Sequence, residues 1–345
     1  MRDVLVPLEV DMALPPGGST LYTTSGTAMG TGWSARLMLP PGADGAALTL
    51  ALQRELDEIV AQMSHWESDS LLSRYNHAPA GSWHALPPHF FDVADYALRV
   101  HEDSGGAYDP AGGQLVNLWG FGATRRYDQA GFYAPDAAAI GAALAQRAAG
   151  QPLLDRATRR LLQPGGVLLD FSSVAKGHAV DCMARCLEQR SMRHYVVEAG
   201  GELRGAGAKA NGEPWWVEIE GVPDADNADN ADNADHRATQ AVVALHGLAI
   251  ATSGDYRRYF QHGARRAAHT LDPRSGYPVA NGVASVTVLA PTCMAADALS
   301  TALTVLGPQD GLAFAEARGI AARFLVRVPG GLLETTSSDW RALLQ

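Results

Sequence analysis

Cysteine is scarce in this chain, and that scarcity excludes a fold held together by disulfides. The 345 residues include 3 cysteines, an odd number and too few for a disulfide framework. Cys182 and Cys186 lie four residues apart and can share one face of a helix, but no Cys/His pattern in the sequence completes a zinc site. We therefore expect Cys182, Cys186 and Cys293 to be buried and to pack as small apolar groups.

Long apolar runs and an excess of basic residues are also missing. No apolar segment approaches the ~20 residues that a transmembrane helix needs. Near the N-terminus, Glu9 and Asp11 interrupt the apolar residues and no cysteine follows for lipid attachment, so we expect no signal peptide or lipobox and a cytoplasmic protein. The net charge of -10 argues against a nucleic-acid partner, which would require a basic face.

Three widespread catalytic motifs are absent as well. The chain has no GxGxxG after a first strand, no phosphate-binding Walker loop and no GxSxG nucleophile elbow. A Rossmann dinucleotide site, a P-loop nucleotide site and an α/β-hydrolase triad are therefore not expected.

Apolar residues make up 47% of the chain, which is enough for a large core, and their spacing alternates between helical and strand periods. We predict one large α+β domain over residues 21–345, with mixed sheets and packed helices, after a loosely attached arm at 1–20. Helices are expected at 46–63, 90–104, 134–147, 295–306 and 310–317; strands are expected at 26–39, 195–198, 215–220, 241–251 and 284–290, with a final hairpin of 322–328 and 332–336.

Residues 224–235, DADNADNADNAD, repeat a short acidic unit that has no large apolar residue. Such a unit cannot contribute to a core, so we expect a solvated loop inserted between two strands. The repeat lacks the glycine and the terminal glutamate of a calcium-binding loop, which argues against that role.

The segment Leu169–Asp181, LDFSSVAKGHAVD, carries the first indication of chemistry. It places Asp170 and the pair Lys176 and Gly177 at a strand-to-helix junction. Free N–H groups and the helix dipole favour negative charge at the start of a helix. A lysine and a carboxylate at that position therefore suit an anionic ligand that carries a metal ion.

Asp297, Thr301 and His269 are the next candidates. Asp297 and Thr301 lie four residues apart, so a helix places both on one face, where a carboxylate and a hydroxyl suit Mg²⁺. The helix dipole alone also explains an aspartate near a helix start. His269 precedes a turn at 272–276; it could accept the proton of an attacking hydroxyl, or it could be structural.

Two further segments combine aromatic and polar residues. In GAYDPAGGQLVNLWGFG (106–122), Asp109 lies in a glycine-rich turn before Trp119 and Phe121, whose rings could accept a flat heterocycle or simply pack in the core. In MSHWESDSLLSRYN (63–76), Trp66 is expected at the surface, and Ser68 or Asp69 is expected to cap a short helix.

Taken together, these segments resemble the ApbE family of FAD:protein FMN transferases. The resemblance begins at Met29-Gly30-Thr31 and runs through the three segments at 63–76, 106–122 and 169–181 to Gly200-Gly201. It continues in TSGDYRRYF (252–260), HTLDPRSGYPV (269–279) and DALSTALTVLG (297–307), and spans about residues 26 to 337 in the family order. Members of this family have a single α+β domain whose cleft holds FAD and Mg²⁺.

The resemblance implies a Mg²⁺-dependent reaction that cleaves FAD, joins FMN through a phosphoester to a Thr or Ser hydroxyl of an acceptor protein, and releases AMP. It implies that Asp297, Thr301 and the carbonyl of Ser173 hold Mg²⁺, that Lys176 adds a cation at the phosphates, and that His269 is the base. The implied FAD site also contains Met29, Trp66, Ala107, Tyr108, Asp109, Asp170, Asp181 and Leu271.

The chain departs from the family pattern at a few positions. Trp66 stands where tyrosine is usual, which keeps an aromatic wall but removes a phenol; Ser172 and Ser173 replace a Gly-Gly pair; Ala111 and Gly112 replace Thr-Val. Two alternatives stay open: a Mg²⁺-dependent FAD pyrophosphatase that gives FMN and AMP, and a flavin-binding protein without activity. The presence of Lys176, His269, Asp297 and Thr301 together argues against the second.

Overall fold

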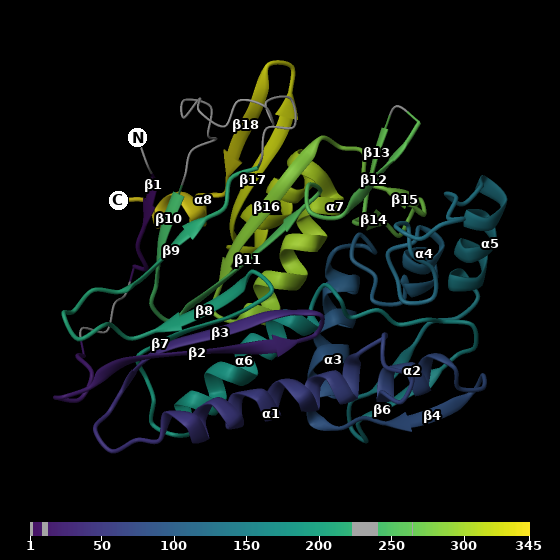
Figure 1. The fold of residues 1–345 in the computed structure, drawn as a ribbon. Helices are drawn as coiled ribbons and strands as arrows, with labels where there is room; N and C mark the ends of the chain where they lie inside the picture. Colours follow the sequence, from purple (N-terminus) through teal and green to yellow (C-terminus); the bar gives the residue numbers. More distant parts are fainter. Residues whose placement is uncertain (1–2, 9–12, 223–240, 264) are drawn as a thin grey trace.

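The computed structural model describes residues 3–8, 13–222, 241–263 and 265–345. Its centre is an eight-stranded sheet in which every neighbouring pair is antiparallel (Figure 1). The strands, in order across the sheet, are β18 (Gly331–Thr336), β17 (Ala321–Val328), β16 (Val283–Ala290), β11 (Leu248–Gly254), β8 (Glu202–Ala206), β7 (Tyr195–Ala199), β3 (Thr31–Leu39) and β2 (Thr20–Ala28).

Helices cover one face of this sheet. The helices that contact the strands on this face are α1 (Gly45–Met63), α6 (Ala175–Glu188) and α7 (Cys293–Arg318). The other helices of the described residues are α2 (Leu71–Asn76), α3 (Pro88–Asp103), α4 (Gly113–Leu118), α5 (Ala137–Ala148) and α8 (Ser338–Ala342). Leu52 of α1 and Met183 of α6 are fully buried against Val197 of β7 in the largest apolar cluster.

A second layer covers the opposite face. It contains a three-stranded sheet of β1 (Asp3–Leu5), β10 (Ala241–Leu245) and β9 (Trp215–Ile219), together with α8. Val196 packs into this layer whereas its neighbour Val197 packs against the helices, as the alternation of side chains along a strand requires. The layered arrangement of helices and antiparallel sheets confirms the α+β prediction.

Smaller sheets complete the fold beside α3, α4 and α5 (Figure 1). They are β4 (Ser82–Ala85), β6 (Arg160–Gln163) and β5 (Leu153–Asp155); β12 (Tyr259–His262) with β13 (Arg265–Ala268); and β14 (Leu271–Asp272) with β15 (Tyr277–Pro278). The sequence patterns did not predict these short strands, α4 or α8, and for α2 they indicated only the start of a helix. Elements of two to six residues carry little periodicity.

The long helices agree with the sequence patterns. The predicted helices at 46–63 and 90–104 are α1 and α3, and α5 begins at Ala137 because Asp136 caps it, with Oδ1 accepting from Ala139 N at 2.8 Å. The helices predicted at 295–306 and 310–317 both lie within α7, on either side of a break at Gly307, whose φ is 84°. Ser70, rather than Ser68 or Asp69, caps α2.

Two predicted strands were wrong because each contains a tight turn. Residues 26–39 form parts of β2 and β3, joined at Met29 and Gly30, whose φ values of 53° and 71° are those of a type I′ hairpin. Residues 241–251 are divided between β10 and β11, which belong to different sheets and turn at Gly247.

The N-terminal segment is not entirely loose. Residues Asp3–Leu5 pair in parallel with β10, and Leu5 is fully buried. The boundary between an arm and the main domain stays a prediction. The acidic repeat at 224–235 lies outside the described residues. In the part of the chain that the structure describes, no helix has both the length and the apolar character needed to cross a membrane.

Candidate active site

The start of α6 packs directly against α7. Gly177 N donates to Asp297 Oδ2 at 2.9 Å. A Cβ at position 177 would lie 2.3 Å from the carbonyl oxygen of Cys293 and 2.8 Å from Asp297 Cβ. Only glycine fits this contact, so the Lys-Gly pair of the sequence places Lys176 beside Asp297.

Lys176, Glu202 and Asp297 form a buried charge cluster. Lys176 Nζ forms an ion pair with Glu202, which follows the Gly200-Gly201 turn, and the lysine side chain is 30% exposed. Burial alone would lower the pKa of Lys176, but Asp297 and Glu202 raise it. Burial raises the pKa of both carboxyl groups, while Lys176 opposes this rise. The cluster therefore presents a cation held between two carboxylates.

Oxygen donors surround the cluster. Thr301 Oγ1 lies 3.0 Å from Ser253 Oγ, and Ser173 Oγ donates to the Tyr108 hydroxyl at 3.1 Å. Glu202 Oε2 is buried without a hydrogen-bond partner among the described residues. Asp297 offers a buried carboxylate, Thr301 offers a hydroxyl, and Ser173 offers a backbone carbonyl. These are the hard oxygen donors that Mg²⁺ prefers, so the donor set fits this ion.

Among the described residues, one ring nitrogen of His269 has a hydrogen-bond partner. Its Nδ1 lies 3.2 Å from the carbonyl oxygen of Arg258, and since a carbonyl only accepts, Nδ1 carries the proton. Nε2 then carries the lone pair and can accept a proton. Burial lowers the pKa of His269 to about 4, and the charges of Arg258 and Lys176 act in the same direction. The imidazole is therefore neutral at neutral pH.

Aromatic rings lie beside His269. The Phe121 ring packs edge-on at 6.2 Å, and Trp119 and Phe260 belong to the same cluster as Leu271. Trp119 donates through Nε1 to Gly276 O at 2.8 Å, which anchors the turn after His269. The rings of Trp119 and Phe121 therefore pack in the core, which is one of the two alternatives that the sequence left open.

The aspartates of the predicted FAD site are strongly held. Asp109 accepts from Arg147 Nε at 2.7 Å and from Arg147 Nη2 at 3.0 Å, and Asp170 Oδ1 accepts from Ser172 N at 2.7 Å. Ala107 and Tyr108, which directly precede Asp109, are buried. Asp109 therefore positions the loop that carries Tyr108.

Asp181 supports the start of α7. Its two carboxylate oxygens accept from Cys293 N at 3.0 Å and Met294 N at 2.9 Å, and Arg204 donates to Oδ1 at 2.7 Å. The side chain is 2% exposed. This geometry gives Asp181 a positioning role through α7; direct contact with FAD stays a prediction.

Trp66 and Met29 are distant in sequence from Lys176, Glu202 and Asp297. Trp66 is 48% exposed, as expected, and the Arg126 guanidinium lies 5.9 Å from its ring centre. Met29 is in the β2–β3 turn with a positive φ that is uncommon outside glycine, asparagine and aspartate.

The structure thus brings together Ser173, Lys176, Asp297, Thr301 and Tyr108, with His269 within electrostatic reach of Lys176. The sequence reasoning missed Glu202, Ser253 and Arg147. Glu202 and Ser253 do lie in or beside segments that carried the family resemblance, but nothing in their local pattern indicated a role.

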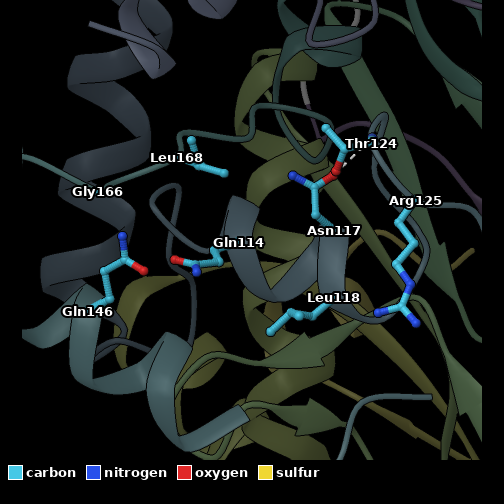
Figure 2. A pocket seen from close by; sticks show the side chains of 8 residues that line it. All are labelled: Gln114, Asn117, Leu118, Thr124, Arg125, Gln146, Gly166 and Leu168. Carbon is cyan, nitrogen blue, oxygen red and sulfur yellow. Dashed lines mark hydrogen bonds between the residues drawn. The ribbon is translucent and has the colours of Figure 1, made fainter. Parts of the chain in front are cut away.

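A cavity of about 340 Å³ lies elsewhere, between α4, α5 and the loop at 124–125 (Figure 2). Figure 2 shows the amide side chains of Gln114, Asn117 and Gln146 around it, with the Asn117 amide oxygen accepting from Thr124 N at 3.4 Å. None of the predicted site residues lines this cavity.

Comparison with known proteins agrees with this arrangement. The model of the ApbE family matches residues 29–324. An FAD:protein FMN transferase of Vibrio cholerae is 36% identical over 93% of this chain and 92% of its own length, and one of Klebsiella pneumoniae is 34% identical over 97% and 93%.

Solved structures give the same result. The flavin transferase ApbE of Vibrio cholerae superposes with a TM-score of 0.84 at 35% identity, covering 94% of this chain and 100% of that one. The flavinyl transferase ApbE of Pseudomonas stutzeri, in its apo form, gives 0.83 at 36% identity, covering 94% and 97%. Sequence, fold and site agree, and the chain belongs to the ApbE family.

Proposed function

We propose that this chain is an FAD:protein FMN transferase. The observation that carries the proposal is the cluster of Lys176, Glu202 and Asp297 at the α6–α7 contact, with a neutral His269 whose Nε2 is free to accept a proton. A phosphoryl transfer needs cationic groups at the phosphates and a base for the incoming hydroxyl, and these residues supply both.

A divalent ion fits the donor set described above. Asp297, Thr301 and the backbone carbonyl of Ser173 would hold Mg²⁺, and the bound ion would neutralise charge on the diphosphate. Lys176 adds a second positive charge, and Glu202 keeps that lysine protonated and oriented. Ser253 orients the Thr301 hydroxyl through the contact at 3.0 Å.

FAD would bind along the surface formed by these residues. Lys176 faces its phosphates, and the remaining residues of the FAD site are Met29, Trp66, Ala107, Tyr108, Asp109, Asp170, Asp181 and Leu271. Trp66 offers an exposed aromatic face to a flat ring system. Asp109 and Asp181 act by holding the Tyr108 loop and the start of α7.

In the reaction, the hydroxyl oxygen of a Thr or Ser on the acceptor protein attacks the phosphorus on the FMN side of the diphosphate. A new phosphorus–oxygen bond forms, and the bond to the AMP phosphate breaks. AMP leaves with the electron pair, and the hydroxyl proton passes to His269 Nε2. The acceptor partner is therefore a protein segment with an accessible Thr or Ser.

The test is to incubate the purified chain with FAD and Mg²⁺, with and without an acceptor protein that carries a Thr/Ser flavinylation segment. Flavin fluorescence on the denatured acceptor, together with one AMP released per label, is the expected result. Release of FMN and AMP without labelling of any acceptor would instead identify a pyrophosphatase, and FAD that is bound but uncleaved would identify a binding protein.

A further inference from the structure

Three side chains with metal-binding atoms converge outside the active site. His89 comes from the first turn of α3, and His178 and Cys182 are one turn apart on α6. His89 Nδ1 lies 3.1 Å from His178 Nε2 and 3.5 Å from Cys182 Sγ. The three atoms all lie within 4.8 Å of one another.

These separations match a tetrahedral zinc centre. With Zn–N bonds of about 2.1 Å and Zn–S bonds of about 2.3 Å at tetrahedral angles, two ligand nitrogens lie roughly 3.4 Å apart and a nitrogen and a sulfur lie roughly 3.6 Å apart. The His89 contacts of 3.1 Å and 3.5 Å are close to both values before any adjustment of the side chains.

The surroundings also suit a metal ion. Cys182 and His178 are each 1% exposed, while His89 is only partly buried and leaves a route for entry. Arg185 Nη2 donates to Cys182 Sγ at 3.0 Å, so this sulfur faces a cation and acts as a hydrogen-bond acceptor. His89 is 93 residues from Cys182 in the chain, so the sequence pattern did not indicate that these residues converge.

We propose that His89, His178 and Cys182 bind one Zn²⁺ ion that joins α3 to α6. The site is separate from the Mg²⁺ donors, which lie on the α7 side of α6. Two imidazoles and a thiolate are borderline and soft ligands that select Zn²⁺ over Mg²⁺. A water molecule reaching the His89 side would complete four-fold coordination.

The test is a titration of the metal-stripped full-length chain with Co²⁺, kept under reducing conditions with excess Mg²⁺ present. We expect one equivalent of Co²⁺ to produce a thiolate-to-cobalt charge-transfer band and the intense visible absorption of a tetrahedral centre, and one equivalent of Zn²⁺ to abolish both. Cys182→Ser should remove the charge-transfer band, and His89→Ala should weaken binding more than ~10-fold, the lower limit for loss of even an outer-shell partner.

Cys186→Ser is the matched control. Cys186 is on the same helix, is 1% exposed, and accepts from Arg190 at 3.1 Å much as Cys182 accepts from Arg185. The band should persist in this variant. A wild-type chain without the band, or a band that survives in Cys182→Ser, would overturn the proposal.

Thermal unfolding gives a second readout that does not depend on colour. Because a ligand that binds only the folded state raises Tm, Zn²⁺ should raise the Tm of the wild type and of Cys186→Ser, and should raise that of folded His89→Ala less at the same Zn²⁺ concentration. An equal rise in Tm for all three proteins would place the zinc elsewhere and contradict the site.

Discussion

Burial and neighbouring charge determine the state of individual side chains in this protein. His269 has its pKa lowered to about 4 by burial, whereas Lys176 keeps a raised pKa because Asp297 and Glu202 outweigh its burial. A neutral imidazole and a protonated lysine are the states that proton acceptance and phosphate binding require.

Replacing Asp297 by alanine should lower Mg²⁺-dependent turnover by at least about 10²-fold, since the diphosphate loses the ion that offsets its charge. AMP release at saturating FAD measures this effect. Asp310→Ala, at an exposed position of the same helix, should keep normal turnover. Near-normal turnover of the Asp297 variant would remove this residue from the site.

Replacing His269 by alanine should lower FMN transfer by about 10²–10⁴-fold while FAD still binds. Single-turnover labelling measures transfer, and flavin fluorescence quenching measures binding. His262→Ala, at an exposed position of β12, is the control. Loss of FAD binding in the His269 variant would make this residue a binding group instead of a base.

The pH profile follows from the same pKa. A histidine that is lowered from 6.5 to about 4 stays neutral throughout the range of pH 5 to 8, in which an ordinary histidine titrates. Titration of His269 should therefore give the transfer rate no inflection near 6.5, and the rate should lose this base only as the pH approaches 4. The profile is compared with that of His269→Ala, because burial raises the pKa of Glu202 in the same site to about 7. An inflection near 6.5 that disappears in His269→Ala would contradict this assignment.

Trp66 offers a separate test of the FAD surface. Removing a stacked ring should weaken FAD binding by about 0.5–1.5 kcal/mol, roughly 2- to 13-fold, and Trp66→Tyr should restore most of it. Trp83 is a close control because it is 38% exposed and has Arg160 5.7 Å from its ring centre. If Trp66→Ala and Trp83→Ala bind FAD equally well, Trp66 does not contact the ligand.

At the scale of elements, α6 and α7 satisfy each other's first turns. Asp297 of α7 accepts from Gly177 N at the start of α6, and Asp181 of α6 accepts from Cys293 N and Met294 N at the start of α7. Each carboxylate lies at a helix start, where free N–H groups and the dipole stabilise negative charge. The two helices therefore fix the positions of Lys176 and Asp297 together.

Gly177→Ala tests this contact. The added Cβ would meet the Cys293 carbonyl at 2.3 Å, so the helices must separate, at a cost of about 1–3 kcal/mol. We expect a lower Tm and reduced turnover, because Asp297 moves with α7. Gly141→Ala, on α5 with nothing within 4 Å of the new Cβ, should raise Tm instead. Equal Tm values for wild type and Gly177→Ala would show that the contact is not tight.

At the scale of the whole molecule, the acidic repeat is an insertion between paired strands. Ile219 at the end of β9 pairs with Ala241 at the start of β10, so the two ends of the connection are adjacent and a shorter loop can close it. Deleting residues 224–235 keeps Glu220, which forms an ion pair with Arg257. Tm and FMN transfer should stay close to wild type. A large loss of transfer with unchanged Tm would mean that the repeat contacts the acceptor protein.

Local pattern was sufficient for the long elements and for the family. Apolar spacing placed α1 and α3 to within two residues at each end, because a periodic stripe on a long helix is a strong signal. Contiguous motifs also predicted Lys176, Asp297 and Thr301 as site residues, since these residues lie in short segments that keep their order and spacing. The local pattern also predicted one strand at 26–39 where the structure has a hairpin, because a methionine-glycine pair is not a common turn signal.

Chemistry that depends on contacts between distant segments was decided by the tertiary structure alone. The sequence by itself determined the α+β class, the family and the residues at the α6–α7 junction. Glu202 beside Lys176, Arg147 on Asp109 and His89 beside Cys182 became visible only when the chain was folded. The physical reason is that periodicity and spacing report neighbours within one element, whereas burial, ion pairing and ligand geometry depend on which elements pack together.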